Sequence, residues 1–186
     1  MIFMLFISWN FQERMLLTDC DFTKIVPEDN ALLRSGVIPY VKRDGKVYFL
    51  LGVDAKTGEW SDFGGGVKAN ENALFGGIRE CYEEMRGIVD FREMGLIRHA
   101  IYERKSKQNM CIMFSEITRP GFFENARKEF HNNQKNGDEM KDIVWLSADE
   151  MLYQSCLSNR KSKIWRRIRY VLSKSGQFNR NFVRRL

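Results

Sequence analysis

The chain has 186 residues, of which 44% are hydrophobic and 14 are Phe, so the composition excludes a disordered chain and predicts one globular domain over residues 1–186. The formal net charge of +6 is uneven, because residues 160–186 carry ten Lys and Arg, while the remainder carries 20 basic and 24 acidic residues. Such a local excess favours a polyanionic partner. The four cysteines form no Cys-x-x-Cys motif and no Cys/His cluster, which argues against a zinc site and favours reduced thiols in the cytoplasm.

Residues 1–9 are an apolar run that is too short to span a bilayer, which needs roughly 20 residues. The run has no basic flank and no cleavage site of small residues, so a secretory signal is not expected. We expect a strand or flap that covers part of the core. The alternative is an interfacial contact with a membrane.

A β-hairpin is predicted next. Residues 35–41 and 46–53 are its two expected strands, and Asp44-Gly45 between them is typical of a tight hairpin turn. Residues 54–59 are a predicted loop that leads into the sequence Trp-Ser-Asp-Phe-Gly-Gly.

Residues 72–85 are predicted to form an amphipathic helix. At about 100° per residue, Glu80, Glu83 and Glu84 fall within one arc and gather negative charge on one face. The opposite face carries apolar residues at helical spacing: Leu74, Ile78, Cys81 and Met85. Like charges at i and i+4 destabilise a bare helix by a few tenths of a kcal/mol, which a divalent cation would offset. The alternative is a solvated acidic face.

The stretch over residues 65–88 resembles the Nudix box, G-x5-E-x7-R-E-U-x-E-E-x-G-U, in which U is an aliphatic residue. Both long spacings are kept, and six positions match residue for residue: Gly65, Glu71, Arg79, Glu80, Glu83 and Glu84. Cys81 departs from the first aliphatic position, and Arg86 is inserted before Gly87, so the box ends one residue late. The insertion follows the carboxylates and therefore concerns the helix exit more than the metal site.

The resemblance implies an α/β/α sandwich with a mixed β-sheet and a loop-helix-loop catalytic motif. It implies that Glu80, Glu83 and Glu84 bind Mg²⁺ or Mn²⁺ together with the backbone at Gly65. Gly64 would let the backbone approach the metal closely, because a side chain there would obstruct it.

The same resemblance assigns orienting roles within the box. Glu71 and Arg79 would tie the glycine loop to the helix and orient the carboxylates, so Arg79 is grouped with the catalytic residues. Gly87 would be structural. The implied reaction is metal-assisted hydrolysis of a nucleoside diphosphate linked to another group, in which water attacks phosphorus in line.

After the box, residues 95–104 and 109–117 are predicted to form a pair of strands, and residues 118–137 are the longest predicted loop. A late strand is expected over residues 141–146. Residues 147–150, Ser-Ala-Asp-Glu, fit a capping box that starts a further helix.

Some Nudix proteins have an additional Glu in a loop before such a late strand, and Glu139 stands at that place here. The resemblance therefore suggests Glu139 as the general base. Two alternatives stay open, namely that Glu83 is the base and that Glu139 is a solvated loop acid.

The basic C-terminal segment, residues 160–186, contains a predicted helix over residues 160–173. The apolar stripe of this helix consists of Ile164, Ile168, Val171 and Leu172. Lys163, Arg166 and Arg167 lie mostly elsewhere on it and are candidates for contact with a phosphate backbone, which would make binding steeply salt-dependent. The alternative is a helix that packs on the core and has a solvated basic face.

Residues 35–88 are also similar to Nudix proteins of large DNA viruses, among them mRNA-decapping enzymes. This similarity implies hydrolysis of the 5′ cap of mRNA with release of m7GDP, in the host cytoplasm if the chain is viral. Trp60 and Phe63 are candidates for stacking on the cap base, and the alternative is that both are core aromatics.

Two other functions stay open. One is hydrolysis of a small diphosphate, such as a dinucleoside polyphosphate, a nucleotide sugar or a diphosphoinositol polyphosphate. The other is a catalytically idle Nudix module that binds RNA. The sequence does not indicate an oligomeric state.

Overall fold

The computed structural model describes residues 14–17, 22–28, 31–90, 97, 99–104, 108–134, 138–158, 160–174 and 176–186. Within this part of the chain, eight strands form one mixed sheet in the order β1-β6-β7-β2-β3-β4, with β5 paired to β2 and β8 paired to β3. The strands are β1 (Arg14–Leu17), β2 (Leu32–Arg43), β3 (Lys46–Asp54), β4 (Trp60–Ser61), β5 (Phe63–Gly66), β6 (His99–Glu103), β7 (Gln108–Glu116) and β8 (Met140–Ser147). β2 and β7 run parallel, and the other pairs are antiparallel.

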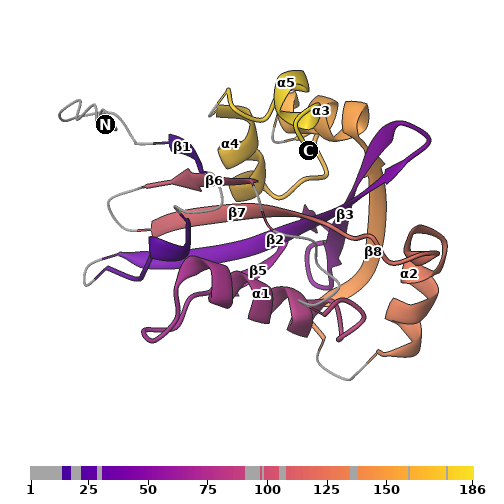
Figure 1. The fold of residues 1–186 in the computed structure, drawn as a ribbon, viewed down its shortest axis with the longest axis horizontal. Helices are drawn as coiled ribbons and strands as arrows, with labels where there is room; N and C mark the ends of the chain where they lie inside the picture. Colours follow the sequence, from indigo (N-terminus) through magenta and orange to yellow (C-terminus); the bar gives the residue numbers. More distant parts are fainter. Residues whose placement is uncertain are drawn as a thin grey trace.

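Helices cover both faces of the sheet. They are α1 (Ala73–Glu84), α2 (Phe122–Asn132), α3 (Ala148–Cys156), α4 (Arg166–Lys174) and α5 (Arg180–Val183), with a short 3-10 helix, η1 (Phe22–Lys24), before β2. Figure 1 shows α1 and α2 on one side of the sheet and α3, α4 and α5 on the other. The expected α/β/α sandwich is therefore confirmed. Among the described residues, no helix is both long and apolar enough to cross a membrane.

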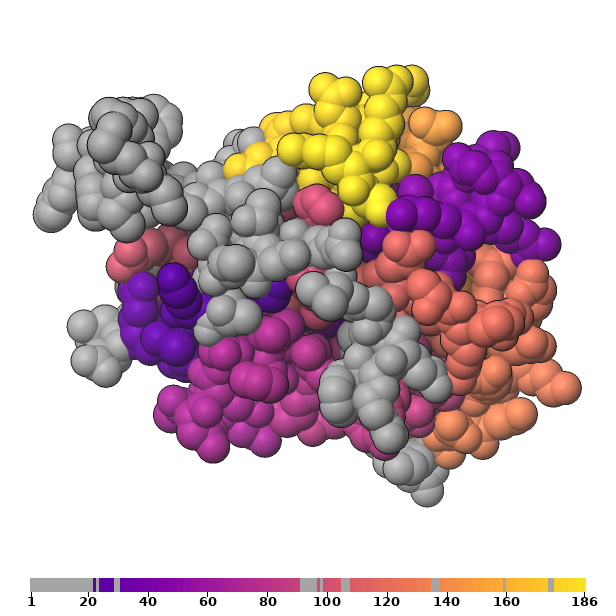
Figure 2. All heavy atoms as spheres, viewed as in Figure 1, coloured from indigo at the N-terminus to yellow at the C-terminus, as the bar shows by residue number. Residues whose placement is uncertain are grey.

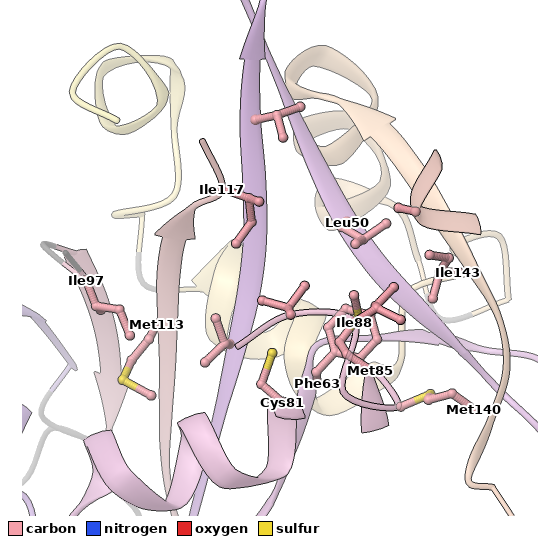
Figure 3. Packing of buried hydrophobic residues seen from close by; sticks show 14 of the residues in the cluster. Leu50, Phe63, Cys81, Met85, Ile88, Ile97, Met113, Ile117, Met140 and Ile143 are labelled. Carbon is pink, nitrogen blue, oxygen red and sulfur yellow. The ribbon is translucent and has the colours of Figure 1, made fainter. Parts of the chain in front are cut away.

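One hydrophobic core lies between the sheet and α1. Figure 3 shows the side chains of Phe63, Met85 and Ile88 close together beside Leu50 of β3. Cys81 and Met85 are fully buried, and the other two residues of the predicted apolar face pack against the same core. The amphipathic pattern of the box helix thus directs its acidic face away from the core.

A second core lies on the opposite face of the sheet and includes the basic C-terminal segment. All four residues of the predicted apolar stripe are buried in it: Ile164, Ile168, Val171 and Leu172. The ring of Phe114 in β7 stacks on Phe178 with centroids 5.8 Å apart, and Phe182 of α5 is fully buried beside them. Figure 2 shows the end of the chain, in yellow, packed next to the β2–β3 hairpin. The segment is therefore an integral part of this core.

The hairpin turn and the first residues of two helices form as the local sequence patterns predict. Asp44 and Gly45 both adopt left-handed backbone conformations, with φ of 49° and 70°, which a tight hairpin turn between β2 and β3 requires. Asn72 caps α1, since its side-chain oxygen accepts from the amide of Phe75 at 2.9 Å. The helix start predicted at residues 147–150 is likewise confirmed, since the side chain of Ser147 accepts from the amide of Glu150 and caps α3.

The predicted loop over residues 118–137 is wrong, because most of it is helix α2. Phe122, Ala126 and Phe130 recur every four residues and are all buried. The charged residues between them point outward, so the high polarity of the segment conceals a narrow apolar stripe.

The helix predicted over residues 160–173 is α4, and it begins later than predicted, at Arg166 and not at residue 160. Residues 160 and 161 form a turn, and Ile164 then forms a parallel β-bridge with Trp60 before the helix begins. The apolar run at residues 1–9, together with residues 95, 96 and 98 of a predicted strand, lies outside the described residues.

We expect Gly36→Ala to destabilise the protein by about 1–3 kcal/mol, because a Cβ at Gly36 would stand 2.1 Å from Oδ2 of the fully buried Asp62. The matched control is Gly66→Ala, since a Cβ there meets nothing within 4 Å. Urea unfolding of both variants is the measurement. Equal stability of the two variants would contradict the close packing of β2 against β5.

Candidate active site

An ion pair buried beneath the glycine loop anchors the site. Arg34 of β2 donates to both carboxylate oxygens of Asp62 at 2.7 Å and to the carbonyl of Gly64 at 2.8 Å. Asp62 is fully buried and Arg34 is 9% exposed. Burial lowers the pKa of Arg34, but the charge and hydrogen bonds of Asp62, together with the charges of Glu84 and Glu80, outweigh that effect and raise the pKa above its ordinary value. The guanidinium of Arg34 is thus held in its charged form.

Glu84 is joined to the same loop. Its carboxylate accepts from the amide of Gly64 at 2.7 Å, so both backbone groups of that glycine are engaged. Burial raises the pKa of Glu84 to about 9, and the charge of Asp62 adds to the shift, while Arg34 and the Gly64 amide oppose it. A carboxylate that is costly to ionise in the protein alone gains most from a neighbouring cation.

Arg79 connects the loop to the acidic face of α1. Its guanidinium donates to both oxygens of Glu71 at 2.8 and 3.0 Å and to the carbonyl of Gly66 at 2.9 Å. It also donates to Glu80 at 2.7 Å and to Glu83 at 3.4 Å. The hydrogen bonds from Arg79 are the main reason that the pKa of Glu71 falls to about 2. This is the orienting arrangement that the resemblance implies.

The glycine loop and the helix approach each other closely at Gly65. A Cβ on Gly65 would stand 2.5 Å from the carboxylate of Glu80. Any side chain there would displace that carboxylate, so a glycine is required by the packing.

Five carboxylates line one hollow of about 170 Å³: Glu80, Glu83, Glu84, Asp138 and Glu139. The structure therefore brings the three predicted metal ligands together with Glu139. Such a set of oxygen donors fits a hard divalent cation such as Mg²⁺ or Mn²⁺. In the described ranges, no three of these groups are already drawn close enough to hold an ion. The present partners of Glu80, Glu83 and Glu84 are Arg79 and the Gly64 amide, which an ion would replace in part.

A second hollow, of about 230 Å³, adjoins the first, since Glu84 and Glu139 line both. It extends to the side chain of Trp165. The Trp60 amide donates to the carbonyl of Lys163 at 2.8 Å, and the Trp165 amide donates to the carbonyl of Trp60 at 2.7 Å. This pairing places the start of the basic helix α4 at the edge of the acidic site.

Three predicted substrate-binding residues are exposed at this edge: Lys163, Arg166 and Arg167. The ammonium of Lys163 lies 4.9 Å from the centroid of the half-buried Trp60 ring, and the guanidinium of Arg167 lies 5.3 Å from that of Trp165. The edge thus combines aromatic rings with cations.

Two other predicted residues have structural positions. Phe63 is fully buried, so its ring offers no face to a base, and the alternative of a core aromatic is correct. Gly87 has a left-handed φ of 72° and its amide donates to the carbonyl of Tyr82 at 2.9 Å, which ends the helix.

A larger cavity, of about 510 Å³, lies between the β2–β3 hairpin and the C-terminal segment. Its lining includes Lys42, Lys46 and Arg184, and Asp149 is the one acidic side chain among the described residues that line it. These described residues do not supply the clustered oxygen donors that metal-assisted hydrolysis needs. The acidic hollow is therefore the better candidate despite its smaller volume.

Several residues of the site are not predicted from the sequence, among them Arg34, Asp62 and Arg86. Arg34 and Asp62 pair across 28 positions of sequence, and no local pattern marks such a pair. The sequence marks Arg86 only as an insertion, although its side chain is 1% exposed and forms an ion pair with Asp138 at 2.8 Å. The one signal for Arg86 in the sequence is the extra residue that breaks the spacing of the box.

No protein-family model matches the sequence, and no curated protein matches it. The fold is similar to that of a C. elegans Ap4A hydrolase binary complex, with a TM-score of 0.53 and 18% identity over 80% of this chain and 97% of that chain. A second crystal structure of C. elegans Ap4A hydrolase gives a TM-score of 0.50 and 18% identity over 80% of this chain and 98% of the other. These similarities show that the chain shares the α/β fold of that hydrolase.

We expect Glu71→Gln to reduce the pH dependence of the free energy of unfolding below about pH 4.5. The folded-state pKa of Glu71, about 2, lies below its ordinary value of 4.5, so the stability it contributes is complete above about pH 4.5 and is lost as the pH falls toward 2. Urea unfolding across this range should show the variant converging on the wild type at low pH. The control is Glu124→Gln, which removes a half-exposed partner of Arg43. A constant difference between wild type and Glu71→Gln at every pH would contradict the coupling.

Proposed function

We propose that the chain is a divalent-metal-dependent pyrophosphohydrolase with Nudix chemistry, which cleaves a nucleoside-diphosphate linkage. The observation that carries this proposal is the acidic hollow, where Glu80, Glu83 and Glu84 of the box meet Glu139 from a distant loop. The fold shared with an Ap4A hydrolase supports it.

A divalent ion in the hollow would stabilise negative charge on the phosphoryl oxygens. The side chains of Glu80, Glu83 and Glu84 would hold it, and Arg79, which is anchored by its two hydrogen bonds to Glu71, would orient the acidic face. Glu139 lines both hollows, so it can reach a water beside the substrate and accept its proton. Glu83 is the alternative base.

The substrate we favour is the 5′ cap of mRNA, with release of m7GDP in the cytoplasm. The support comes from the second hollow, because it leads from the acidic site to Trp165 and the adjacent basic helix start. Cations and aromatic rings at one edge suit an RNA chain whose cap end occupies the hollow.

A second candidate substrate is a dinucleoside polyphosphate. The specific observation in its favour is the fold similarity to C. elegans Ap4A hydrolase, which covers 97% of that chain. Both substrates share the bond that is cleaved, so the box alone does not distinguish them.

We expect Glu83→Gln and Glu84→Gln each to reduce turnover by more than about 100-fold, because each variant removes the charge of a metal ligand. Loss of a residue that only contacts a metal ligand costs roughly 10–100-fold. Folding should be intact, since the amide keeps the size of the side chain. Turnover with Mg²⁺ or Mn²⁺ and thermal unfolding are the measurements, with the exposed Glu124→Gln as the control. Wild-type turnover in both box variants would refute the site.

Product analysis distinguishes the two substrates. Cap-labelled RNA and Ap4A would be incubated separately with the protein and Mn²⁺, with Glu84→Gln as the inactive control. Release of m7GDP from RNA alone supports decapping, and cleavage of Ap4A alone moves the function to small dinucleotides. Cleavage of neither substrate by the wild type would contradict the proposed chemistry for both.

We expect Arg166→Gln with Arg167→Gln to weaken binding of long capped RNA and to reduce the slope of log K against log salt by roughly 2, while cleavage of a free cap dinucleotide changes little. The matched control is Arg184→Gln with Arg185→Gln. Both arginines are exposed and follow α5 directly, and Arg184 lines the larger cavity instead of either hollow of the site. Truncation of the chain end is a poor substitute, since it removes the buried Phe182. Equal losses in the two double variants would exclude a specific RNA path over α4.

A further inference from the structure

Arg86, the residue inserted into the box, occupies an unusual position at the exit of α1. Its backbone has a left-handed φ of 55°, which is uncommon for a residue other than glycine, and Gly87 follows with a φ of 72°. This strained turn sends the Arg86 side chain away from solvent, so that it is 1% exposed. A conformation of this kind persists only where the surrounding contacts stabilise it.

The buried guanidinium of Arg86 joins three elements. It donates to the carbonyl of Phe130 at 2.8 Å, in the last turn of α2, where helix carbonyls lack partners of their own. It donates to the carbonyl of Met140 at 2.6 Å, at the start of β8. Its Nε lies 2.8 Å from the carboxylate of Asp138, and its Cζ lies 3.7 Å from the centroid of the Phe130 ring.

These contacts fall on both sides of Glu139. The residue before it, Asp138, is held by its carboxylate, and the residue after it, Met140, is held by its carbonyl. The carbonyl of Glu139 itself accepts from the amide of Ala55 at 2.8 Å. Glu139 thus projects into the acidic hollow from a peptide segment that Arg86 fixes at two points.

We propose that Arg86 is a positioning residue that holds Glu139 over the acidic hollow and ties its loop to the end of the box helix. The ion pair also joins Asp138 to Arg86, whereas Glu139 has no such cation partner among the described residues. Only the kinetic consequence rests on the proposed function. The placement of the Glu139 peptide can be tested without any turnover.

Arginine suits this position better than lysine does. The guanidinium presents donors in several fixed directions, whereas an ammonium is a single point of charge on a flexible stem. Arg86→Lys should therefore keep the ion pair with Asp138 and lose the bonds to one or both carbonyls. Arg86→Gln should lose the ion pair as well.

The first test is hydrogen exchange of the Ala55 amide, which reports on the Glu139 carbonyl. In Arg86→Gln, we expect exchange at Ala55 to accelerate at least tenfold relative to that at Trp60, whose amide bonds to Lys163 at 2.8 Å. The control for general destabilisation is Ala126→Gly in α2, which changes a fully buried residue that forms no bond to Arg86. Unchanged exchange at Ala55 in Arg86→Gln would overturn the proposal, whatever the activity.

The second test is a double-mutant cycle in kcat between Arg86→Lys and Glu139→Gln. If Arg86 acts through Glu139, Arg86→Lys should lower kcat about tenfold or more in the wild type, with little change in KM, and about twofold or less when Glu139 is already Gln. A positioning role would be contradicted if the losses of kcat from the two substitutions were additive. It would also be contradicted if Arg86→Lys lowered stability without lowering kcat. If the wild type cleaves no diphosphate, the proposed function fails and the exchange experiment alone decides this inference.

Discussion

The buried ion pair between Arg34 and Asp62 is the constraint on which the site depends. Two charges in the interior are tolerated because each satisfies the other, and removal of one partner from such a pair typically costs about 3–5 kcal/mol. The same guanidinium binds the Gly64 carbonyl, and the Gly64 amide binds Glu84. A continuous chain of contacts therefore runs from the centre of the sheet to the carboxylate that is hardest to ionise. Gly36 completes the arrangement, because a residue with a Cβ at this position would collide with the side chain of Asp62.

Charge in the site is compensated unevenly. Arg79 binds three carboxylates of the box, and Arg86 binds Asp138. Glu84 and Glu139 line the hollow with no such cation in direct contact among the described residues, and the charge of Glu139 adds to the cost of ionising Glu84. A divalent ion between them would relieve this repulsion. Binding of the ion and organisation of the site are thus two aspects of one electrostatic requirement.

Short-range patterns in the sequence predicted the hairpin, the box helix and the apolar stripe of the C-terminal helix, because each depends on neighbours within a few residues. The box spacing likewise brought Glu71, Arg79 and the acidic face together correctly. The Arg34–Asp62 pair could not be predicted, since 28 positions separate its partners and only the β2–β5 pairing brings them together. Helix α2 was missed because three buried residues in a highly charged segment are a weak signal. Glu139 was reached only through the resemblance, and its contact with the box residues depends on the β3–β8 register.

The most direct test of the central claim is anomalous diffraction from crystals of the wild-type protein grown with Mn²⁺. The carboxylate geometry predicts a strong manganese peak in the acidic hollow, with oxygen atoms of Glu80 and Glu84 at ligand distance and the Arg79 contact to Glu80 lengthened or broken. The same crystals of Glu84→Gln should lose that peak or show it greatly weakened. A wild-type hollow that stays free of manganese, or a peak bound by other residues, would contradict the assignment of this site to metal-assisted hydrolysis.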